Sequence, residues 1–251
     1  MYPVLFSIGT WELHASDFFL ALGLLVGALF GWRQSRRLGY PGHQVLLFLL
    51  SVVPFGLLLA SLNGLLFWLG LSGFLENLSK PLSGGLVSFG AVLGALFLGW
   101  VFARRYRTPP GEVLDLVALT LPLILAIYRI GCLLNGCCYG LETDGSLGMY
   151  LPAGPNGVWA PRYPTQIMLI AFNLGLFAWL WHYRQTRPLD GNLTLSFLIL
   201  YSFGRLLIDA LRDLPRVWWL FSPHQLAAIA ILVVSGYLWL DLWIGRRRTA
   251  R

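Results

Sequence analysis

Two arginines are the residues of this 251-residue chain best placed to do chemistry, because each interrupts an otherwise apolar run. Arg129 lies near the end of the run 114–134, and Arg205 lies within the run 193–211. An arginine inside an apolar helix costs at least about 2.5 kcal/mol, so each one needs a partner. Asp209 follows Arg205 by four residues, which is one helical turn, and can pair with it.

These two arginines allow two interpretations. In the first, Arg205 forms a buried ion pair with Asp209, and Arg129 extends its long side chain to the outer surface of a membrane. In the second, both arginines project into one polar cavity and bind a phosphate, which guanidinium groups recognise through paired hydrogen bonds. A phospholipid head group is the anion most available at that depth.

The segment that follows Arg129 has the residue types of a ligand-binding turn. Gly131, Gly136 and Gly140 allow the backbone to come close to a ligand. The side-chain amide of Asn135 can donate hydrogen bonds to phosphate or ester oxygens.

The same segment holds three cysteines, at positions 132, 137 and 138. A Cys-x4-Cys-Cys pattern without a clear fourth ligand is a poor zinc site, so we expect no metal. A disulfide is possible if the segment faces an oxidising compartment. Inert thiols that pack as small hydrophobic side chains are equally consistent with the pattern.

The composition indicates the elements that must position these residues. Hydrophobic residues make up 57% of the chain and charged residues only 12%, about half the share that is typical of soluble proteins. A mean hydropathy of +0.68 excludes a disordered chain and an ordinary cytosolic enzyme. A membrane-spanning helix needs about 20 mostly apolar residues. Seven runs meet this need: 13–32, 44–71, 82–103, 114–134, 165–183, 193–211 and 224–244.

The runs are too long and too uniformly apolar for the strands of a β-barrel. We therefore expect an all-α, polytopic membrane protein of about seven transmembrane helices, forming a single membrane domain over residues 1–251. The connection at about 135–164 is rich in glycine and proline, which predicts a small irregular head on the outer side. Its aromatic residues favour packing at the membrane interface over disorder; they are Tyr139, Tyr150, Trp159 and Tyr163.

The distribution of positive charge predicts the orientation. If the N-terminus lies outside, twelve of the eighteen Lys and Arg residues fall on the inner side, four on the outer side and two within the membrane. This bias is what the positive-inside rule requires, with the C-terminus in the cytoplasm. It also accounts for the net charge of +7 without a nucleic-acid partner. Because no Lys or Arg precedes the first run, we expect a retained helix and not a cleaved signal peptide.

Five segments stand out along nearly the whole chain: Phe6–Gly9 with Leu13 and His14; Gly84–Phe89 with Gly94; Arg129–Gly131 with Asn135, Gly136, Tyr139 and Gly140; Arg162–Gln166; and Tyr201–Arg205 with Asp209 and Arg212. In this order they resemble the bacterial prolipoprotein diacylglyceryl transferase family. The third segment resembles the signature sequence of the family and is the most specific.

The resemblance implies that the chain transfers the diacylglyceryl group of phosphatidylglycerol to the lipobox cysteine thiol of prolipoproteins, with glycerol 1-phosphate as the leaving group. It implies no cofactor, and its partners would be phosphatidylglycerol, prolipoprotein signal peptides and membrane lipids in the bacterial cytoplasmic (inner) membrane. Arg129 and Arg205 would be catalytic, and Asp209 and Arg212 structural or ion-paired. The expected substrate-binding residues are Arg129, Asn135, Gly136, Tyr139, Gly140, Ser88, Gly85 and Arg162.

The chain departs from the family pattern at several positions. Gly90 stands where the family has a histidine, a candidate base, and Cys132 stands where it has an asparagine. A free thiol has a pKa of about 8.5 and must lose its proton before it attacks. Three hypotheses therefore stay open: another group accepts the proton; the chain is a non-catalytic or altered-specificity relative that binds phospholipid or lipoprotein; or the three cysteines make it a redox protein.

Overall fold

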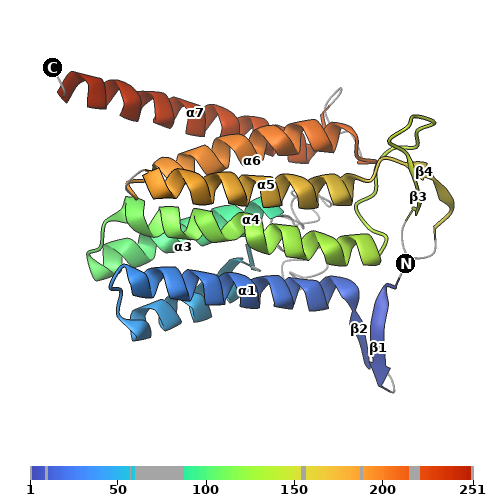
Figure 1. Ribbon diagram of the computed structural model, residues 1–251, viewed down its shortest axis with the longest axis horizontal. Coiled ribbons are helices and arrows are strands. Elements are labelled where there is room, and N and C mark those ends of the chain that lie inside the picture. Colours follow the sequence, from blue (N-terminus) through green and yellow to red (C-terminus); the bar gives the residue numbers. More distant parts are fainter. Residues whose placement is uncertain are drawn as a thin grey trace, which may run out of the picture. The chain divides into compact units, whose positions relative to one another are not determined.

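The computed structural model describes residues 2–8, 11–56, 58–59, 88–153, 157–186, 189–214 and 221–249. These residues are mostly helical (Figure 1). The helices are α1 (Ala15–Arg37), a helix over Gly42–Gly56, α3 (Ser88–Tyr106), α4 (Pro110–Leu134), α5 (Thr165–Thr186), α6 (Asn192–Ala210) and α7 (Pro223–Thr249).

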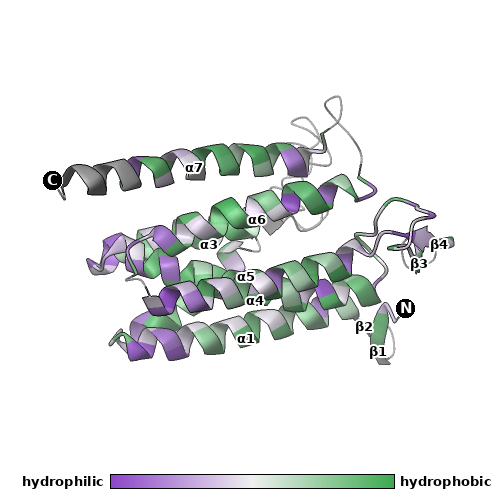
Figure 2. Ribbon diagram, turned by 45° about the horizontal axis from the view of Figure 1, so that its top comes forward, coloured by the Kyte–Doolittle hydropathy of each residue, from purple (hydrophilic) through white to green (hydrophobic). Residues whose placement is uncertain are grey.

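Five of the described helices, namely α1, α4, α5, α6 and α7, are long and apolar enough to cross a membrane. Hydrophobic residues occupy most of their length (Figure 2). Large apolar side chains such as Leu29 on α1 and Val233 on α7 are exposed, by 62% and 65%. Exposed apolar surface of this extent suits contact with lipid. The predicted runs 44–71 and 82–103 lie partly outside the described residues, so the count of seven helices stays a prediction.

The chain divides into two compact units, so the single domain over residues 1–251 also stays a prediction. The first unit comprises residues 1–27, 122–186 and 195–251, and the second comprises residues 28–121 and 187–194. Both predicted arginines, Arg129 and Arg205, belong to the first unit.

In the first unit, glycines let α1 pack closely on α4. A Cβ atom on Gly23 would lie 3.0 Å from the carbonyl oxygen of Ile124, and one on Gly131 would lie 2.8 Å from that of Ala15. Small residues at helix interfaces allow such close backbone approach in membranes. The packing fixes the last turns of α4, which carry Arg129.

Two short antiparallel hairpins complete the first unit, at the end of its helices where α4 ends and α5 begins (Figure 1). One pairs β1 (Val4–Ile8) with β2 (Trp11–His14), and the other pairs β3 (Met149–Pro152) with β4 (Trp159–Arg162). The head that the sequence predicts to be irregular thus contains regular pairing. Strands of four residues are too short to show alternation, and prolines at positions 152 and 161 hide them further.

In the second unit, a buried carboxylate holds the start of α6. Asp115 on α4 accepts hydrogen bonds from the backbone N–H of Gly191 (2.9 Å), the backbone N–H of Thr194 (2.8 Å) and the Thr194 hydroxyl (2.7 Å). The first N–H groups of a helix lack intrahelical partners, and a negative charge beside them is favourable. Asp115 therefore acts as a cap that α4 supplies to α6.

Candidate active site

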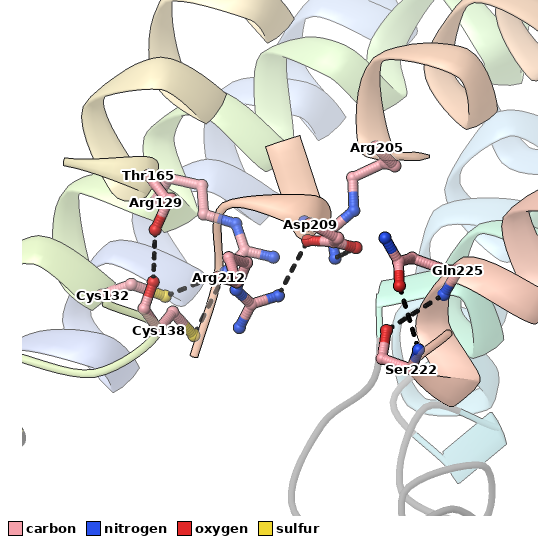
Figure 3. A network of polar contacts seen from close by, with 9 residues as sticks. All are labelled: Arg129, Cys132, Cys138, Thr165, Arg205, Asp209, Arg212, Ser222 and Gln225. Atoms are coloured by element: carbon pink, nitrogen blue, oxygen red, sulfur yellow. Dashed lines mark hydrogen bonds and ion pairs between the residues drawn. The ribbon is translucent and has the colours of Figure 1, made fainter. Parts of the chain in front are cut away.

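The predicted arginines gather at the hairpin end of the first unit. Arg129 lies near the end of α4, Arg205 and Asp209 lie one turn apart on α6, and Arg212 follows the end of that helix. Figure 3 shows the three arginines converging on the region around Asp209.

A single carboxylate joins two of these arginines. Asp209 lies 2.9 Å from Nη2 of Arg205 and 3.2 Å from Nη1 of Arg212. All three side chains are buried, with exposed fractions of 0% for Asp209, 1% for Arg205 and 7% for Arg212. The ion pair of Arg205 and Asp209, which the spacing suggested, is thus present as part of a larger network.

Arg129 is the third arginine of the network, and it is 5% exposed. Its Nη1 donates to Sγ of Cys132 (3.7 Å) and to Sγ of Cys138 (3.4 Å). Its guanidinium also lies 5.5 Å from the centre of the Tyr128 ring, a favourable cation–π distance. Figure 3 shows Arg129 beside Arg205, Asp209 and Arg212. The two predicted catalytic arginines therefore belong to one site.

Arginines outnumber acids among the described residues that this network brings together. Of the nine residues drawn in Figure 3, three are arginines and one, Asp209, is an acid. Buried charge of this kind is unfavourable unless a counter-charge offsets it. An anion that enters the site would supply the counter-charge, and a phosphate suits guanidinium groups well.

Two polar residues at the start of α7 border this network (Figure 3). The Ser222 N–H donates to Oε1 of Gln225 (2.9 Å), and the Gln225 N–H donates to Oγ of Ser222 (3.3 Å). This reciprocal pair is a capping box, which fixes where the helix begins.

The three cysteines form a compact cluster beside Arg129. All are free, and their Sγ atoms lie within 4.8 Å of one another. Hydrogen bonds from the Cys132 and Cys137 thiols, and then the positive charges of Arg129 and Arg212, lower the pKa of the Cys138 thiol. The sequence showed no charge partner for a reactive cysteine, whereas the structure provides these two.

The contacts of Arg162 are with residues outside the Asp209 network. It forms an ion pair with Glu142 and lies 3.8 Å from a carboxylate oxygen of Asp213. Its Nη1 donates to the Gly140 carbonyl (3.4 Å), and its guanidinium lies 5.0 Å from the centre of the Tyr139 ring. Arg162 thus connects the end of β4 to the segment around Tyr139 and Gly140.

Gly140 is needed where it stands because other backbone crowds it. A Cβ atom there would lie 2.9 Å from the Leu211 carbonyl oxygen and closer still to that of Tyr163. Gly140 also pairs with Arg212 as an isolated β-bridge. This close approach sets the backbone position from which Arg212 reaches Asp209.

The structure describes the remaining predicted substrate-binding residues only in part. Asn135 and Gly136 form the turn after α4, and the Asn135 side chain is half-buried. Gly85 and the side chain of Ser88 lie outside the described residues, although Ser88 begins α3. Gly90 is buried in α3 and belongs to the second unit.

Sequence reasoning missed several contacts that shape the site. Glu142 and Asp213 lie 20 and 51 positions from Arg162, and no spacing rule links them to it. The contact between Arg129 and Cys132 could have been found, because residues three apart are neighbours on a helix.

Replacing Asp209 with asparagine removes the carboxylate that two buried guanidinium groups contact. We expect the free energy of unfolding to fall by about 3–5 kcal/mol, because breaking a buried ion pair leaves uncompensated charge. The measurement is equilibrium unfolding of the purified protein in detergent. Asp213→Asn, at a carboxylate whose side chain is 51% exposed, is the matched control and should change stability by less than about 0.5 kcal/mol. Equal stability of the two variants would contradict the prediction.

Comparison with known proteins identifies the family of the chain. Residues 3–240 match the family described as prolipoprotein diacylglyceryl transferase. A phosphatidylglycerol–prolipoprotein diacylglyceryl transferase of Clostridium perfringens is 30% identical, with 99% of each chain covered. One from Dehalococcoides mccartyi is 36% identical over 84% of this chain and 82% of its own length. One from Legionella pneumophila is 28% identical over 94% and 95%. The chain therefore belongs to the prolipoprotein diacylglyceryl transferase family.

Proposed function

We propose that the chain transfers the diacylglyceryl group of phosphatidylglycerol to a cysteine thiol of prolipoproteins. The observation that carries the proposal is the convergence of three buried arginines, Arg129, Arg205 and Arg212, around Asp209. Both substrates appear in the names of the relatives from Clostridium perfringens and Dehalococcoides mccartyi.

The reaction places a growing charge where the arginines lie. The substrate thiolate attacks the glyceryl carbon that bears the phosphate, so that an S–C bond forms while the C–O bond breaks. The electron pair of the C–O bond goes to the phosphate oxygen, and glycerol 1-phosphate leaves with one more negative charge than the phosphodiester carried. Arg129 and Arg205 stabilise that charge most strongly in the transition state, which is the condition for catalysis.

The other predicted residues take supporting roles in this proposal. Asn135 and Gly136, in the turn after α4, are assigned to binding the lipid near its ester and phosphate oxygens. Arg162 acts through Tyr139 and Gly140, since its contacts hold that segment in place. Ser88 and Gly85 remain candidates for substrate contact from the region that leads into α3.

A second candidate is a non-catalytic relative that binds phospholipid or lipoprotein in the same place. The observation that favours it is Gly90, which has no side chain to serve as a base where the family has a histidine. The assay below separates the two candidates.

We expect purified chain, given phosphatidylglycerol and a peptide with a lipobox cysteine, to release glycerol phosphate. Arg129→Ala should lower kcat/KM at least about 100-fold, because removing one stabilising donor of a developing anion typically has that effect. Arg129→Lys keeps the charge but loses the paired hydrogen bonds, so its rate should lie between those of the wild type and the alanine variant. Enzymatic detection of released glycerol phosphate is the measurement.

Arg37→Ala, at an exposed arginine of α1, is the matched control and should keep the wild-type rate. A wild type that binds phosphatidylglycerol without any turnover would contradict the transferase and support the non-catalytic relative.

We also propose that the chain crosses the bacterial inner membrane seven times, with the N-terminus outside and the C-terminus in the cytoplasm. The charge bias supports this orientation, since twelve Lys and Arg residues fall on the proposed inner side and four on the outer side. In this orientation the hairpins and the arginine network lie near the outer surface.

The orientation predicts opposite results for two reporters fused after Arg251. A green fluorescent protein should fluoresce, because it folds in the cytoplasm, whereas alkaline phosphatase should be inactive there. Assaying both fusions in whole cells is the measurement. Active phosphatase with a dark fluorescent fusion would place the C-terminus outside and contradict the proposal.

A further inference from the structure

The proposed reaction assigns no role to the cluster of three cysteines. Cys132, Cys137 and Cys138 are all the cysteines of the chain, and their three Sγ atoms lie within 4.8 Å of one another. They come from the last helical turns of α4 and the turn that follows it. Three soft ligands that converge in this way suit a thiophilic metal ion.

The turn that carries the cluster is held in an unusual conformation. Cys138 has a φ of 64°, which is rare for a residue other than glycine and unfavourable by about 1–3 kcal/mol. The Thr165 hydroxyl donates to the Cys138 carbonyl (2.8 Å), and Nε2 of Gln166 donates to the Cys137 carbonyl (2.8 Å). The start of α5 thus stabilises a backbone that brings the thiols together.

We propose that these three cysteines bind one Zn²⁺ as thiolates and leave its fourth position for the sulfur of the substrate cysteine. The inference rests on the proposed function, because it supplies the thiolate that the reaction needs. Catalytic zinc sites have three protein ligands and one open position. The missing fourth ligand, which argues against a structural zinc site, is therefore what a catalytic site requires.

The geometry is close to what such a site needs. A Zn–S bond of about 2.3 Å places sulfurs about 3.8 Å apart in a tetrahedral site. The present separations, at most 4.8 Å, need only small side-chain rotations to reach that value. In the part of the chain that the structure describes, no Asp, Glu or His joins the group, so the three sulfurs supply three of the four ligands that zinc takes.

The surrounding charges fit the metal and the lipid together. Zn²⁺ with three thiolates carries a net charge of −1, and Arg129 donates hydrogen bonds to two of the three sulfurs. Such outer contacts orient metal ligands and tune them. Arg205 and Arg212 share Asp209 and lie where the proposed function puts the phosphodiester. Arg129 lies between the two groups, so the bound nucleophile is placed beside the phosphate that leaves.

The step balances without an oxidant or a further base from the protein. A thiol that binds Zn²⁺ is deprotonated, and its proton passes to the solvent. The thiolate then forms the S–C bond as the C–O bond breaks, and the electron pair leaves with glycerol 1-phosphate. The product is a neutral thioether, a weaker ligand than a thiolate, which leaves the metal. Such a site removes the need for a base at position 90.

The test uses reduced, tag-free protein in detergent and measures bound metal rather than turnover. Zinc content is measured by mass spectrometry, and Co²⁺ is used as a probe because its thiolate complexes absorb light. We expect about one metal ion per chain and at least about tenfold weaker Co²⁺ binding for the Cys132→Ser, Cys137→Ser and Cys138→Ser variants. His182→Gln, which removes an exposed histidine outside the cluster, should bind metal as the wild type does.

A lipobox peptide with cysteine should change the Co²⁺ spectrum to that of four thiolates, and the same peptide with serine should not. Serine variants that bind as much metal as the wild type would overturn the inference, as would a disulfide in the reduced protein or a spectrum unchanged by the cysteine peptide. Full turnover by metal-free protein would overturn the inference and leave the proposed function standing. A positive metal and peptide test without any release of glycerol phosphate would support the site while the proposed function fails.

Discussion

The structure of the site depends on one carboxylate that two buried guanidinium groups share. Asp209 holds Arg205 and Arg212 by ion pairs of 2.9 and 3.2 Å, in surroundings that exclude nearly all solvent. Arg129 lies beside them, so three guanidinium groups lie around this carboxylate. Buried charge is unfavourable unless a counter-charge offsets it. Binding of an anion beside these groups is what the proposed function requires.

The fold holds these groups in place through close backbone contacts at glycines and through side chains that cap helix ends. Glycines seat the end of α4 against α1, and Gly140 pairs with the backbone of Arg212. The capping box of Ser222 and Gln225 fixes the start of α7. In the second unit, Asp115 serves α6 in the same manner, by accepting hydrogen bonds from its first residues. Hydrogen bonds from side chains thus fix the starts of α6 and α7.

Much of the membrane character and the centre of the site could be predicted from the sequence. Arg129 and Arg205 stand out because a charge in an apolar run is expensive, and Asp209 follows from helical spacing. The hairpin of β3 and β4 could not be predicted, since its strands of four residues are interrupted by proline and show no period. The pairing of Arg162 with Glu142 and Asp213 depends on how distant segments meet. The cysteines were visible, but only the turn at Gly136 and Cys138 brings their sulfurs together.

The most direct test of this account is whether the arginine network binds the phosphate of the lipid. Native mass spectrometry or equilibrium titration can compare phosphatidylglycerol with diacylglycerol, which lacks the phosphate. We expect the chain to prefer phosphatidylglycerol and Arg129→Gln to weaken its binding at least about tenfold, because a charge-assisted hydrogen bond contributes about 1.5–3 kcal/mol. Binding of diacylglycerol should not change in that variant. Equal affinity of the wild type for both lipids, or an unchanged affinity of the variant for phosphatidylglycerol, would contradict it.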